Sequence, residues 1–274
     1  MATPIGNLGD LSPRAAEALV SSDAVAAEDT RRTLKLFGHL GKKPPALVSL
    51  PAFDERGRLG GIVDRLREGQ TVALCTDAGT PGISDPGAML VEAAWEIGAL
   101  VVPIPGPSAS ASALAASGFP ADRFFFSGFL PRKGGARRDA LALLARVPAT
   151  LVLYEAGNRT AETLHDLAEA LGDRMALVAR ELTKLHEQLE RARLTELAER
   201  FAGEVLGEVT LVVAPPAEGT PAVAEATAEP LEAELRRRLE AGEPPSGLAR
   251  DVARERGLKR SDVYDEIERI KKAE

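Results

Sequence analysis

The segment that decides the fold is an apolar run followed by a long loop, Thr71-Val72-Ala73-Leu74-Cys75-Thr76-Asp77-Ala78-Gly79-Thr80-Pro81-Gly82-Ile83-Ser84-Asp85-Pro86-Gly87. Residues 71–76 have the length and the Val and Leu content of a buried strand. The loop 77–87 is longer than a simple strand-to-helix connection needs, and it holds three glycines, two prolines and two aspartates. Because α/β proteins bind ligands at the carboxyl ends of parallel strands, this loop predicts one wall of a ligand site.

The same alternation of short apolar runs and amphipathic stretches extends to about Val213. The further predicted strands are residues 24–27, 46–50, 100–104, 123–127, 150–154, 175–179 and 208–213. The predicted helices 13–22, 55–69 and 160–172 each follow or begin at a capping residue, namely Ser12, Asp54 and Thr160. This alternation is typical of β-α-β units and therefore of largely parallel sheets that are covered on both faces.

The domain boundaries are predicted from breaks in this pattern. Three prolines within Pro103–Pro107 cannot continue a ladder or a helix, so we expect two α/β domains, 1–104 and 108–214, with a cleft between them. Residues 214–229 are rich in Pro, Ala, Glu and Thr, which indicates a linker before a helical extension, 230–274.

Both ends of the chain carry an expectation of their own. In the extension, apolar spacing predicts two short helices joined around Gly257, either as a helix-turn-helix-like unit or as a helical hairpin on the main body. At the other end, the glycine-bearing loop 3–10 begins without the strand that should precede it. We therefore expect either a missing first strand or a start site placed several residues too late, and we favour the second.

The composition excludes several classes of protein. The net charge of −7 argues against a protein that coats nucleic acid non-specifically, although a local basic face is compatible with RNA. Cys75 is the only cysteine, so no intramolecular disulfide forms and a reducing cytoplasm is expected. The three histidines are not closely paired, so no metal site is expected. No apolar run is long enough to span a bilayer and no secretory signal is recognised, so we expect no membrane contact.

Polar and charged side chains gather on several other loops. Ser108 in the turn 105–110 can cap the next helix or touch a ligand, and the aromatic–basic segment 124–133 suits either a buried strand or nucleic acid. The segment 179–187 places five ionisable groups directly after a predicted strand. A surface helix start explains much of this clustering, and a substrate or catalytic role explains it as well.

In this order, the motifs resemble the tetrapyrrole methylase superfamily, and more closely the ribosomal RNA small-subunit methyltransferase I family. The resemblance runs from about Ala2 to Val213 and rests on six segments, namely residues 2–10, 27–31, 77–87, 105–109, 127–133 and 179–187. A single motif would not identify the family, but six motifs in a consistent order are specific for it. The resemblance implies an α/β, two-domain tetrapyrrole methylase-like fold with mostly parallel sheets, plus a small C-terminal helical extension.

The resemblance also implies an activity. S-adenosylmethionine would be the methyl donor, bound between the domains of a homodimer, and a cytidine 2′-hydroxyl in the decoding region of 16S ribosomal RNA would accept the methyl group. The positions that match the cofactor loops are Leu8, Asp77, Thr80, Ile83, Ser108, Ala109, Phe129 and Glu155. The candidates for binding the substrate are Asp29, Arg31, Arg132, Lys133, Arg159 and Arg180.

Two segments depart from the family pattern. The family usually has a His-Glu-His-Asn-Glu-like segment where this chain has Leu50–Glu55, and a Tyr-Glu-Ser-Pro-His-Arg-like run where it has Tyr154–Arg159. The lost histidines weaken any mechanism that needs a histidine base at these places, and they leave Glu155 and Arg159 as the retained groups.

The expected chemistry is a displacement that requires three atoms in line and benefits from a base beside the ribose hydroxyl. The candidate bases are Glu181, His186 and Glu187, with Lys184 and Arg180 orienting phosphate or ribose.

Two other functions remain open: a methyltransferase that acts on a tetrapyrrole, and a non-catalytic RNA-binding or ribosome-assembly module. The acidic net charge favours the tetrapyrrole, whereas the basic pairs Arg31-Arg32 and Arg132-Lys133 favour RNA.

Overall fold

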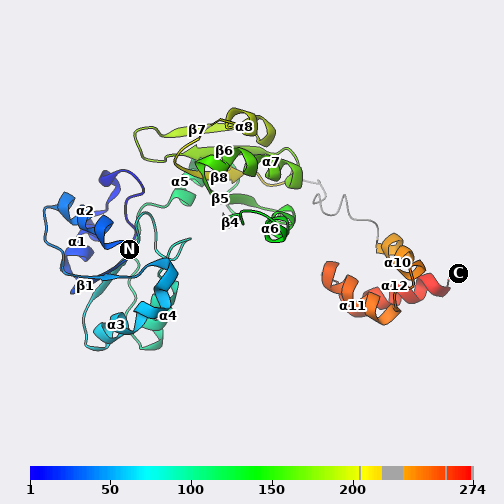
Figure 1. Cartoon of the computed structure of the whole chain (residues 1–274), viewed down its shortest axis with the longest axis horizontal. Helices are drawn as coiled ribbons and strands as arrows, with labels where there is room; N and C mark the ends of the chain where they lie inside the picture. The colour runs from blue at the N-terminus through cyan, green and yellow to red at the C-terminus, as the bar shows by residue number, and fades with distance from the viewer. Residues whose placement is uncertain (204, 218–230, 257, 273–274) are drawn as a thin grey trace. The chain divides into compact units, whose positions relative to one another are not determined.

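The computed structural model describes residues 1–203, 205–217, 231–256 and 258–272. They belong to two compact units, Met1–Ala222 and Val223–Glu274 (Figure 1). The first unit contains both predicted α/β domains, whose boundaries at 104 and 108 stay predictions. Most of the predicted linker, from residue 218 onward, lies outside the described residues.

The first sheet has three strands, all parallel, in the order β2-β1-β3. Its strands are β1 (Ala24–Ala27), β2 (Ala46–Ser49) and β3 (Val72–Cys75). Every residue of the central strand β1 is buried, because helices cover both faces of the sheet. These helices are α1 (Pro13–Ser21), α2 (Thr30–Leu40), α3 (Glu55–Arg67) and α4 (Ala88–Glu96). The polypeptide also forms two short 3-10 helices here, η1 (Leu8–Asp10) and η2 (Ala52–Asp54).

The second sheet has five strands in the order β4-β5-β8-β6-β7. They are β4 (Phe124–Phe129), β5 (Thr150–Ala156), β6 (Met175–Arg180), β7 (Gln188–Arg193) and β8 (Glu208–Val213). Only β4 and β5 pair in parallel, while β8 runs antiparallel to both β5 and β6, and β7 runs antiparallel to β6. The α/β class is thus confirmed, with a parallel first sheet and a mixed second one. β6 and β7 form an antiparallel hairpin through the short connection 181–187, and β8 adds two further antiparallel pairings.

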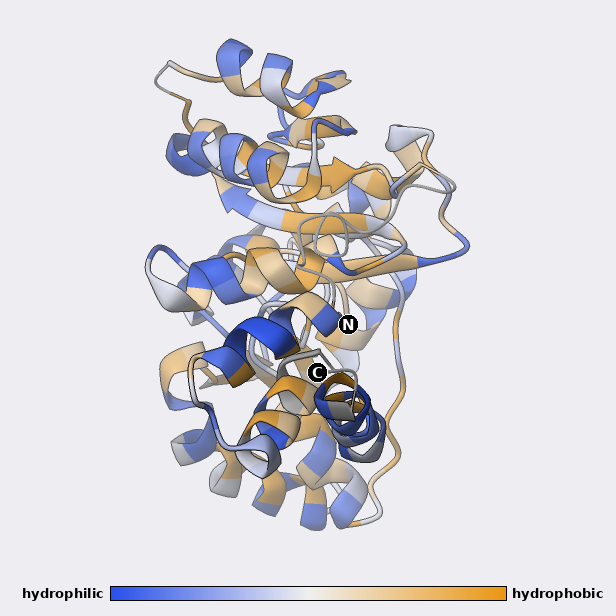
Figure 2. Cartoon of the chain, turned by 90° about the vertical axis from the view of Figure 1, so that its right-hand side faces the viewer, coloured by the Kyte–Doolittle hydropathy of each residue, from blue (hydrophilic) through white to orange (hydrophobic). Residues whose placement is uncertain are grey.

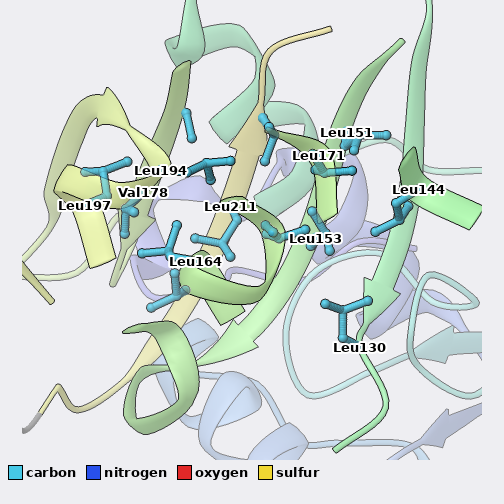
Figure 3. Close-up of a cluster of buried hydrophobic side chains, with 14 of the residues drawn as sticks. Leu130, Leu144, Leu151, Leu153, Leu164, Leu171, Val178, Leu194, Leu197 and Leu211 are labelled. Atoms are coloured by element: carbon cyan, nitrogen blue, oxygen red, sulfur yellow. The ribbon is translucent and has the colours of Figure 1, made fainter. Parts of the chain in front are cut away.

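A leucine-rich core lies under the second sheet (Figure 3). Leu151, Leu153 and Leu211 of the sheet pack with Leu164 and Leu194 of the covering helices. The helices of this core are α6 (Gly135–Ala145), α7 (Thr160–Leu171) and α8 (Leu194–Arg200), with a 3-10 turn η3 (Gly157–Arg159) before α7. A separate cluster joins α5 (Ala109–Ser117) to Val152, Leu177 and Val212 of the same sheet. Figure 2 shows helices with one hydrophilic and one hydrophobic face, as expected for helices that cover a sheet.

The helix boundaries were predicted better than the helix caps. Ser12 caps α1 as predicted, because its side chain accepts a hydrogen bond from Ala15 N at 3.1 Å. Asp54 makes no such bond, and its carboxylate instead pairs with Arg58 of the same helix at 3.2 Å. Thr160 is the first residue of α7 rather than its cap, and its hydroxyl donates to Ala156 O. Asp54 thus stands at the predicted N-cap position of α3 without a capping bond, whereas the predicted cap at Thr160 was wrong.

One predicted strand is absent and one observed strand was not predicted. Residues 100–104 form no strand in the described part of the chain. Ile104 O accepts a backbone hydrogen bond from Ala2 N at 3.3 Å. The adjacent prolines lack the N–H groups that a ladder needs. Conversely, β7 was not predicted, because Gln188–Arg193 carries three charges and buries only Ala192.

In its described residues, the second unit has three helices, which share a core of their own. They are α10 (Leu231–Glu240), α11 (Pro245–Arg256) and α12 (Arg260–Lys272). The buried side chains include Leu235, Leu248, Val252, Val263 and Ile267. The two helices predicted around Gly257 are confirmed as α11 and α12, with α10 in front of them. Within the described residues, no helix combines the length and the apolar character that a membrane crossing requires.

Candidate active site

The N-terminal segment joins the loop 3–10 to the loop 77–87. Thr3 and Gly79 exchange two backbone hydrogen bonds, of 2.9 and 3.0 Å, and the Thr3 hydroxyl donates to Thr76 O at 3.0 Å. Gly79 has a φ of +84°, a conformation that favours glycine. The first two candidate loops therefore lie side by side at the carboxyl end of β3.

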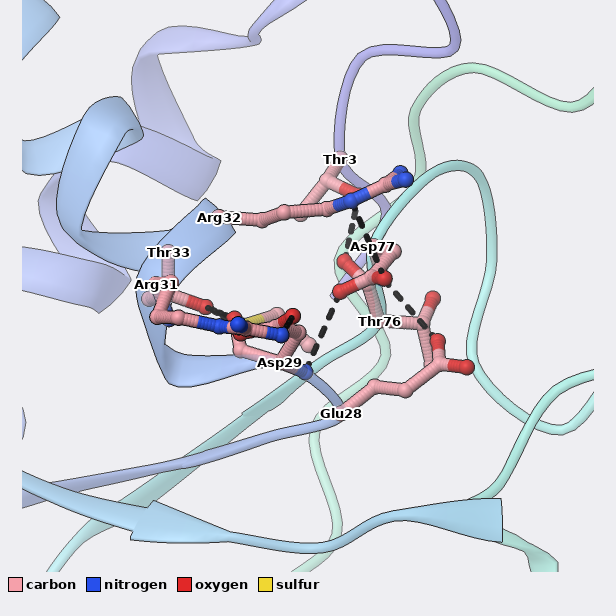
Figure 4. A network of polar contacts seen from close by, with 9 residues as sticks. Thr3, Glu28, Asp29, Arg31, Arg32, Thr33, Thr76 and Asp77 are labelled. Atoms are coloured by element: carbon pink, nitrogen blue, oxygen red, sulfur yellow. Dashed lines mark hydrogen bonds and ion pairs between the residues drawn. The ribbon is translucent and has the colours of Figure 1, made fainter.

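Charged side chains from the ends of β1 and β3 form a network beside these loops (Figure 4). Asp77 accepts a hydrogen bond from Asp29 N at 3.1 Å, its own N–H donates to Glu28 at 3.2 Å, and Arg32 lies 3.3 Å from its second oxygen. Burial raises the pKa of Asp77, and the charge of Arg32 opposes this shift. Arg31 pairs with Asp29 at 2.6 Å, and this hydrogen bond lowers the pKa of Asp29 to about 2.

The far end of the loop 77–87 is held by Glu55. One oxygen of its carboxylate accepts hydrogen bonds from three backbone N–H groups at the start of α4, those of Gly87, Met89 and Leu90, at 3.0, 3.1 and 3.3 Å. A carboxylate at a helix N-terminus satisfies free donors and complements the helix dipole. Glu55 belongs to the segment 50–55 that departs from the family pattern, so this acidic residue has a clear structural role.

The loops of the first sheet contact the loops of the second. The Thr80 hydroxyl donates to Pro107 O at 3.3 Å, and Gly128 of β4 is so close to Ser84 that a Cβ there would lie 3.2 Å from its Oγ. A Cβ on Gly6 would overlap the side chain of Lys184. Groups from both sheets therefore meet where the ligand site was predicted.

The predicted catalytic cluster 181–187 is centred on Lys184. Its Nζ lies 2.8 Å from Glu181 Oε1 and 2.9 Å from Glu208 Oε2. Burial opposes the charge of both Glu181 and Lys184, but their mutual hydrogen bond and the bonds to Glu208 outweigh it, so the pKa of Glu181 is lowered and that of Lys184 is raised. Lys184 is thus a fixed cation.

The remaining members of the cluster differ in their surroundings. Glu187 accepts a hydrogen bond from Thr183 N at 2.6 Å, whereas His186 is exposed. Arg180 donates from Nε to Leu206 O at 2.7 Å. Among the described residues other than glycine, positive φ occurs at Ser84, Glu181 and Thr183, at 63°, 50° and 66°. Such strained positions cluster at functional loops, and all three lie in the two candidate loops.

The predicted cofactor contacts fall into two groups. Leu8 and Ile83 are apolar side chains that are 46% and 37% exposed on their loops, and Phe129, at the end of β4, is 56% exposed. Their exposure is compatible with contact to a ligand. Thr80 and Ile83 also line a groove of about 720 Å³ against α4. Ser108 and Ala109 stand at the start of α5, where the Ser108 side chain does not cap the helix and instead lies 3.0 Å from Ser110 Oγ.

Glu155 and Arg159 lie in a buried network of the second sheet. The Glu155 side chain has no exposed surface, and it accepts hydrogen bonds from Thr163 Oγ1 at 2.7 Å and Ala156 N at 2.8 Å. Arg159 lies 3.4 Å from it and donates to Leu130 O. This arrangement gives both residues a structural role, and their predicted contacts with ligands stay predictions.

The basic residues also differ in their exposure and in whether they have a partner within the protein. Arg132 and Lys133 are exposed and make no hydrogen bond or ion pair with any residue that the structure describes. Arg137, by contrast, is buried and pairs with Asp166 at 2.6 Å. Asp166 is one of three possible metal ligands on α7, with His165 and Glu169, but its pairing with Arg137 already occupies it.

Two acidic residues of the site, Glu28 and Glu208, were not among the predicted site residues. Glu28 accepts a hydrogen bond from Asp77 N, and Glu208 pairs with Lys184. Together with Asp77 they raise the pKa of Asp85, although burial is the larger cause. No local signal marks Glu208, which is the exposed first residue of β8.

The comparisons with known proteins agree with one another. The chain matches the family Tetrapyrrole (Corrin/Porphyrin) Methylases over residues 2–198. It is 49% identical over 217 residues to a Xylella fastidiosa protein named Ribosomal RNA small subunit methyltransferase I, covering 78% of this chain and 79% of that protein. A Synechocystis sp. protein of the same name is 45% identical over 267 residues, or 96% of this chain and 94% of that protein.

The fold is similar to that of solved methyltransferases. One is uroporphyrin-III C-methyl transferase from Thermus thermophilus, complexed with S-adenosyl homocysteine. It matches with a TM-score of 0.53 at 21% identity, over 76% of this chain and 93% of that chain.

Proposed function

Because the chain belongs to the ribosomal RNA small subunit methyltransferase I family of the tetrapyrrole methylases, we propose that it is an S-adenosylmethionine-dependent methyltransferase of 16S ribosomal RNA. Its acceptor is the 2′-hydroxyl of a cytidine in the decoding region. The observation that carries the proposal is the meeting of the loops 3–10, 77–87 and 181–187, which come from two sheets.

The residues at this place fit the proposed methyl donor. S-adenosylmethionine offers an adenine ring, ribose hydroxyls and an ammonium group. The exposed apolar side chains Leu8, Ile83 and Phe129 suit the ring, while the Asp77 carboxylate suits a hydroxyl or the ammonium. The buried hydroxyl of Thr183 has no hydrogen-bond partner among the described groups, so it is free to contact a ligand atom. When bound, the donor supplies a methyl group on a positively charged sulfur.

The cluster 181–187 orients the acceptor nucleotide. Lys184 is held between Glu181 and Glu208, so its cation is placed in advance for a phosphate or ribose oxygen. His186 and Glu187 lie exposed on the same loop. Asp29, Arg31, Arg159 and Arg180 are further candidates for substrate contacts, each already held by an intramolecular partner.

The free charges of Arg132 and Lys133 favour RNA over a small tetrapyrrole, because they can neutralise phosphates without breaking a bond in the protein. We expect Lys133→Ala to weaken binding to the small ribosomal subunit and to lower the slope of log affinity against log salt by about 1. Filter binding at several salt concentrations measures this. Arg67→Ala, on the exposed side of α3, is the matched control and should leave the slope unchanged.

Methyl transfer from labelled S-adenosylmethionine tests the proposed function directly. The acceptors to compare are assembled small subunits, free 16S RNA and a uroporphyrinogen-type tetrapyrrole. We expect transfer to assembled subunits, and a product that resists alkaline cleavage at one cytidine, since a methylated 2′-oxygen cannot attack the neighbouring phosphate. Transfer to the tetrapyrrole alone would overturn the proposal, and binding of RNA without transfer would identify a non-catalytic module.

The proposal extends to assembly and location. The protein is a homodimer in the cytoplasm, as the family resemblance implies and as a chain with a single buried cysteine allows. Sedimentation equilibrium at micromolar concentration checks the dimer, and a single monomeric species would contradict it.

A further inference from the structure

Two arginines hold the backbone where β4 leads into the loop 130–134. Arg137 Nη1 donates to Pro131 O at 3.0 Å, and Arg159 Nη2 donates to the neighbouring carbonyl of Leu130 at 3.2 Å. Leu130 is 2% exposed and belongs to the leucine-rich core (Figure 3), whereas the two residues after Pro131 are exposed. The chain therefore passes from the core to the surface at two carbonyls that guanidinium groups hold.

Arg137 is committed to the protein itself. Its Nε donates to Asp166 Oδ2 at 2.6 Å and its Nη2 donates to Thr163 Oγ1 at 3.1 Å, while its Nη1 holds Pro131. Thr163 in turn donates to Glu155 Oε2 at 2.7 Å, so the guanidinium belongs to the buried network of the second sheet. All three guanidinium nitrogens thus donate within the chain, and the side chain is only 7% exposed to an RNA phosphate.

The place of Arg137 in the fold is electrostatically unfavourable. Arg137 is the third residue of α6, and the first turn of a helix carries the positive end of the helix dipole. Burial of a charged side chain also costs free energy, and an apolar residue of similar volume is often as stable. Fold stability alone therefore gives weak grounds for an arginine here. The hydrogen bond to Pro131 O is a contact that an apolar residue could not supply.

Arg132 and Lys133 lie between two fixed points. The ring of Pro131 restricts its φ, and Arg137 holds its carbonyl. Gly134 is the N-cap of α6 with a φ of +79°, and its carbonyl accepts a hydrogen bond from the first turn of the helix at 3.3 Å. The two basic residues are the whole connection between these points. Their backbone is therefore restrained, while their side chains have no partner in the described part of the chain.

We propose that Arg137 is a positioning residue for RNA, which fixes Pro131 and thereby sets the direction in which Arg132 and Lys133 meet the phosphates. The inference rests on the proposed function, because it requires an RNA substrate. Cations that are held in place before binding lose less conformational entropy on contact than cations on a mobile loop. Arg137 thereby contributes to RNA affinity without touching RNA.

The test uses Arg137→Lys, which keeps a positive charge but loses the planar fork that donates in three directions. Affinity for assembled small subunits is measured by filter binding at several salt concentrations, in the wild-type background and in Arg132→Ala/Lys133→Ala. In the wild-type background, Arg137→Lys should weaken binding about tenfold and lower the slope of log affinity against log salt by about 1 to 2. In the double-alanine background it should change affinity less than about twofold, because the groups through which it acts are gone.

Digestion of the folded protein with trypsin reports on the loop itself. Cleavage after Arg132 and Lys133, relative to cleavage elsewhere in the chain, should become at least about tenfold faster in Arg137→Lys, because a released loop opens more often. Affinity for S-adenosylhomocysteine should stay within about twofold, since Phe129 is held by the ladder between β4 and β5. Leu144→Val, in the buried face of the same helix, is the control for lost stability and should leave RNA affinity and relative cleavage unchanged.

A second variant covers the case in which Arg137→Lys does not fold. Asp166→Asn keeps the guanidinium but removes the charge that orients it, so the same changes should appear at a smaller size. Wild-type affinity and loop cleavage in this variant would contradict the inference.

The outcomes separate this inference from the proposed function. A wild type that neither binds nor methylates small subunits would overturn the proposed function. If the wild type is active and Arg137→Lys weakens binding equally in both backgrounds, or leaves loop cleavage unchanged, the inference fails alone and Arg137 is a structural residue. The inference also fails if Arg132→Ala/Lys133→Ala binds small subunits as tightly as the wild type.

Discussion

Glu155 illustrates how a buried carboxylate supports the second sheet. Its two oxygens satisfy Thr163 and Ala156 N, and Arg159 lies against it. Removing one partner of a buried charged pair leaves the other without compensation, at a cost of several kcal/mol.

We therefore predict that Glu155→Ala lowers the free energy of unfolding by about 3 kcal/mol, because it leaves Arg159 and the Thr163 hydroxyl without their acceptor. Urea denaturation measures the change. Glu96→Ala, at the exposed end of α4, is the control and should change stability by less than about 0.5 kcal/mol. Equal stability of the two variants would contradict the structural role.

Asp85 predicts a pH dependence of stability with a defined sign. Its pKa is about 6 in the folded chain and 3.8 in the absence of the fold, so folding favours the protonated form. As the pH rises from about 4 to about 6, ionisation of Asp85 lowers the stability of the folded state. Asp85→Asn removes this cost and should be more stable than the wild type by about 1 kcal/mol at pH 8, allowing for the partial exposure of the group.

Urea denaturation at pH 4 and pH 8 checks this prediction. The difference between Asp85→Asn and the wild type should be largest at pH 8 and should shrink toward zero at pH 4. An asparagine variant less stable than the wild type at pH 8 would show that the carboxylate is stabilised by a group other than those described above.

Among the elements, the contact between the loops 3–10 and 181–187 depends on a glycine. We predict that Gly6→Ala displaces Lys184, because the added Cβ would overlap its side chain, and that methyl transfer falls at least tenfold with a loss of about 1 kcal/mol in stability. Gly60→Ala, in the helix α3, is the matched control. Apart from its chain neighbours and the backbone of its own helix, no described atom lies within 4 Å of the new Cβ, so the change should stabilise the chain by about 0.5–1 kcal/mol with full activity. The methyl-transfer rates and urea midpoints of the two variants are compared. A wild-type rate in Gly6→Ala would show that the contact between Gly6 and Lys184 does not matter for activity.

The sequence predicted the elements that are decided locally. β1 and β8 match their predicted residues, because each is an apolar run whose burial needs no knowledge of its neighbours. β7 was not predicted from the sequence, because this edge strand is largely exposed and has no apolar pattern. Residues 100–104 have such a pattern, but no ladder forms there.

The candidate site also has parts that the sequence predicts and parts that it does not. Its loops were found from glycine, proline and charge content, which are local. The bonds of Lys184 to Glu208 and of Glu55 to the start of α4 join residues 24 and 32 or more positions apart, and sequence spacing gives no hint of them. The burial that raises the pKa of Asp85 also arises only from the fold.

At the scale of the whole molecule, the two units have separate cores. We predict that a chain ending at residue 217 keeps its affinity for S-adenosylhomocysteine within about twofold, because every proposed cofactor contact lies in the first unit. Calorimetric titration of the full and shortened chains measures this. A loss of more than about fivefold would mean that the helical unit contributes to the cofactor site.

The buried thiol of Cys75 makes the protein well suited to site-directed labelling. Cys75 is 1% exposed, and burial raises the pKa of its thiol to about 11, so maleimide reagents find almost no thiolate to attack. A cysteine introduced at an exposed position, such as Leu258 of the helical unit, would then be the single reactive thiol. A fluorophore or spin label there would report, without any prior cysteine removal, whether the surroundings of the helical unit change when small ribosomal subunits are added.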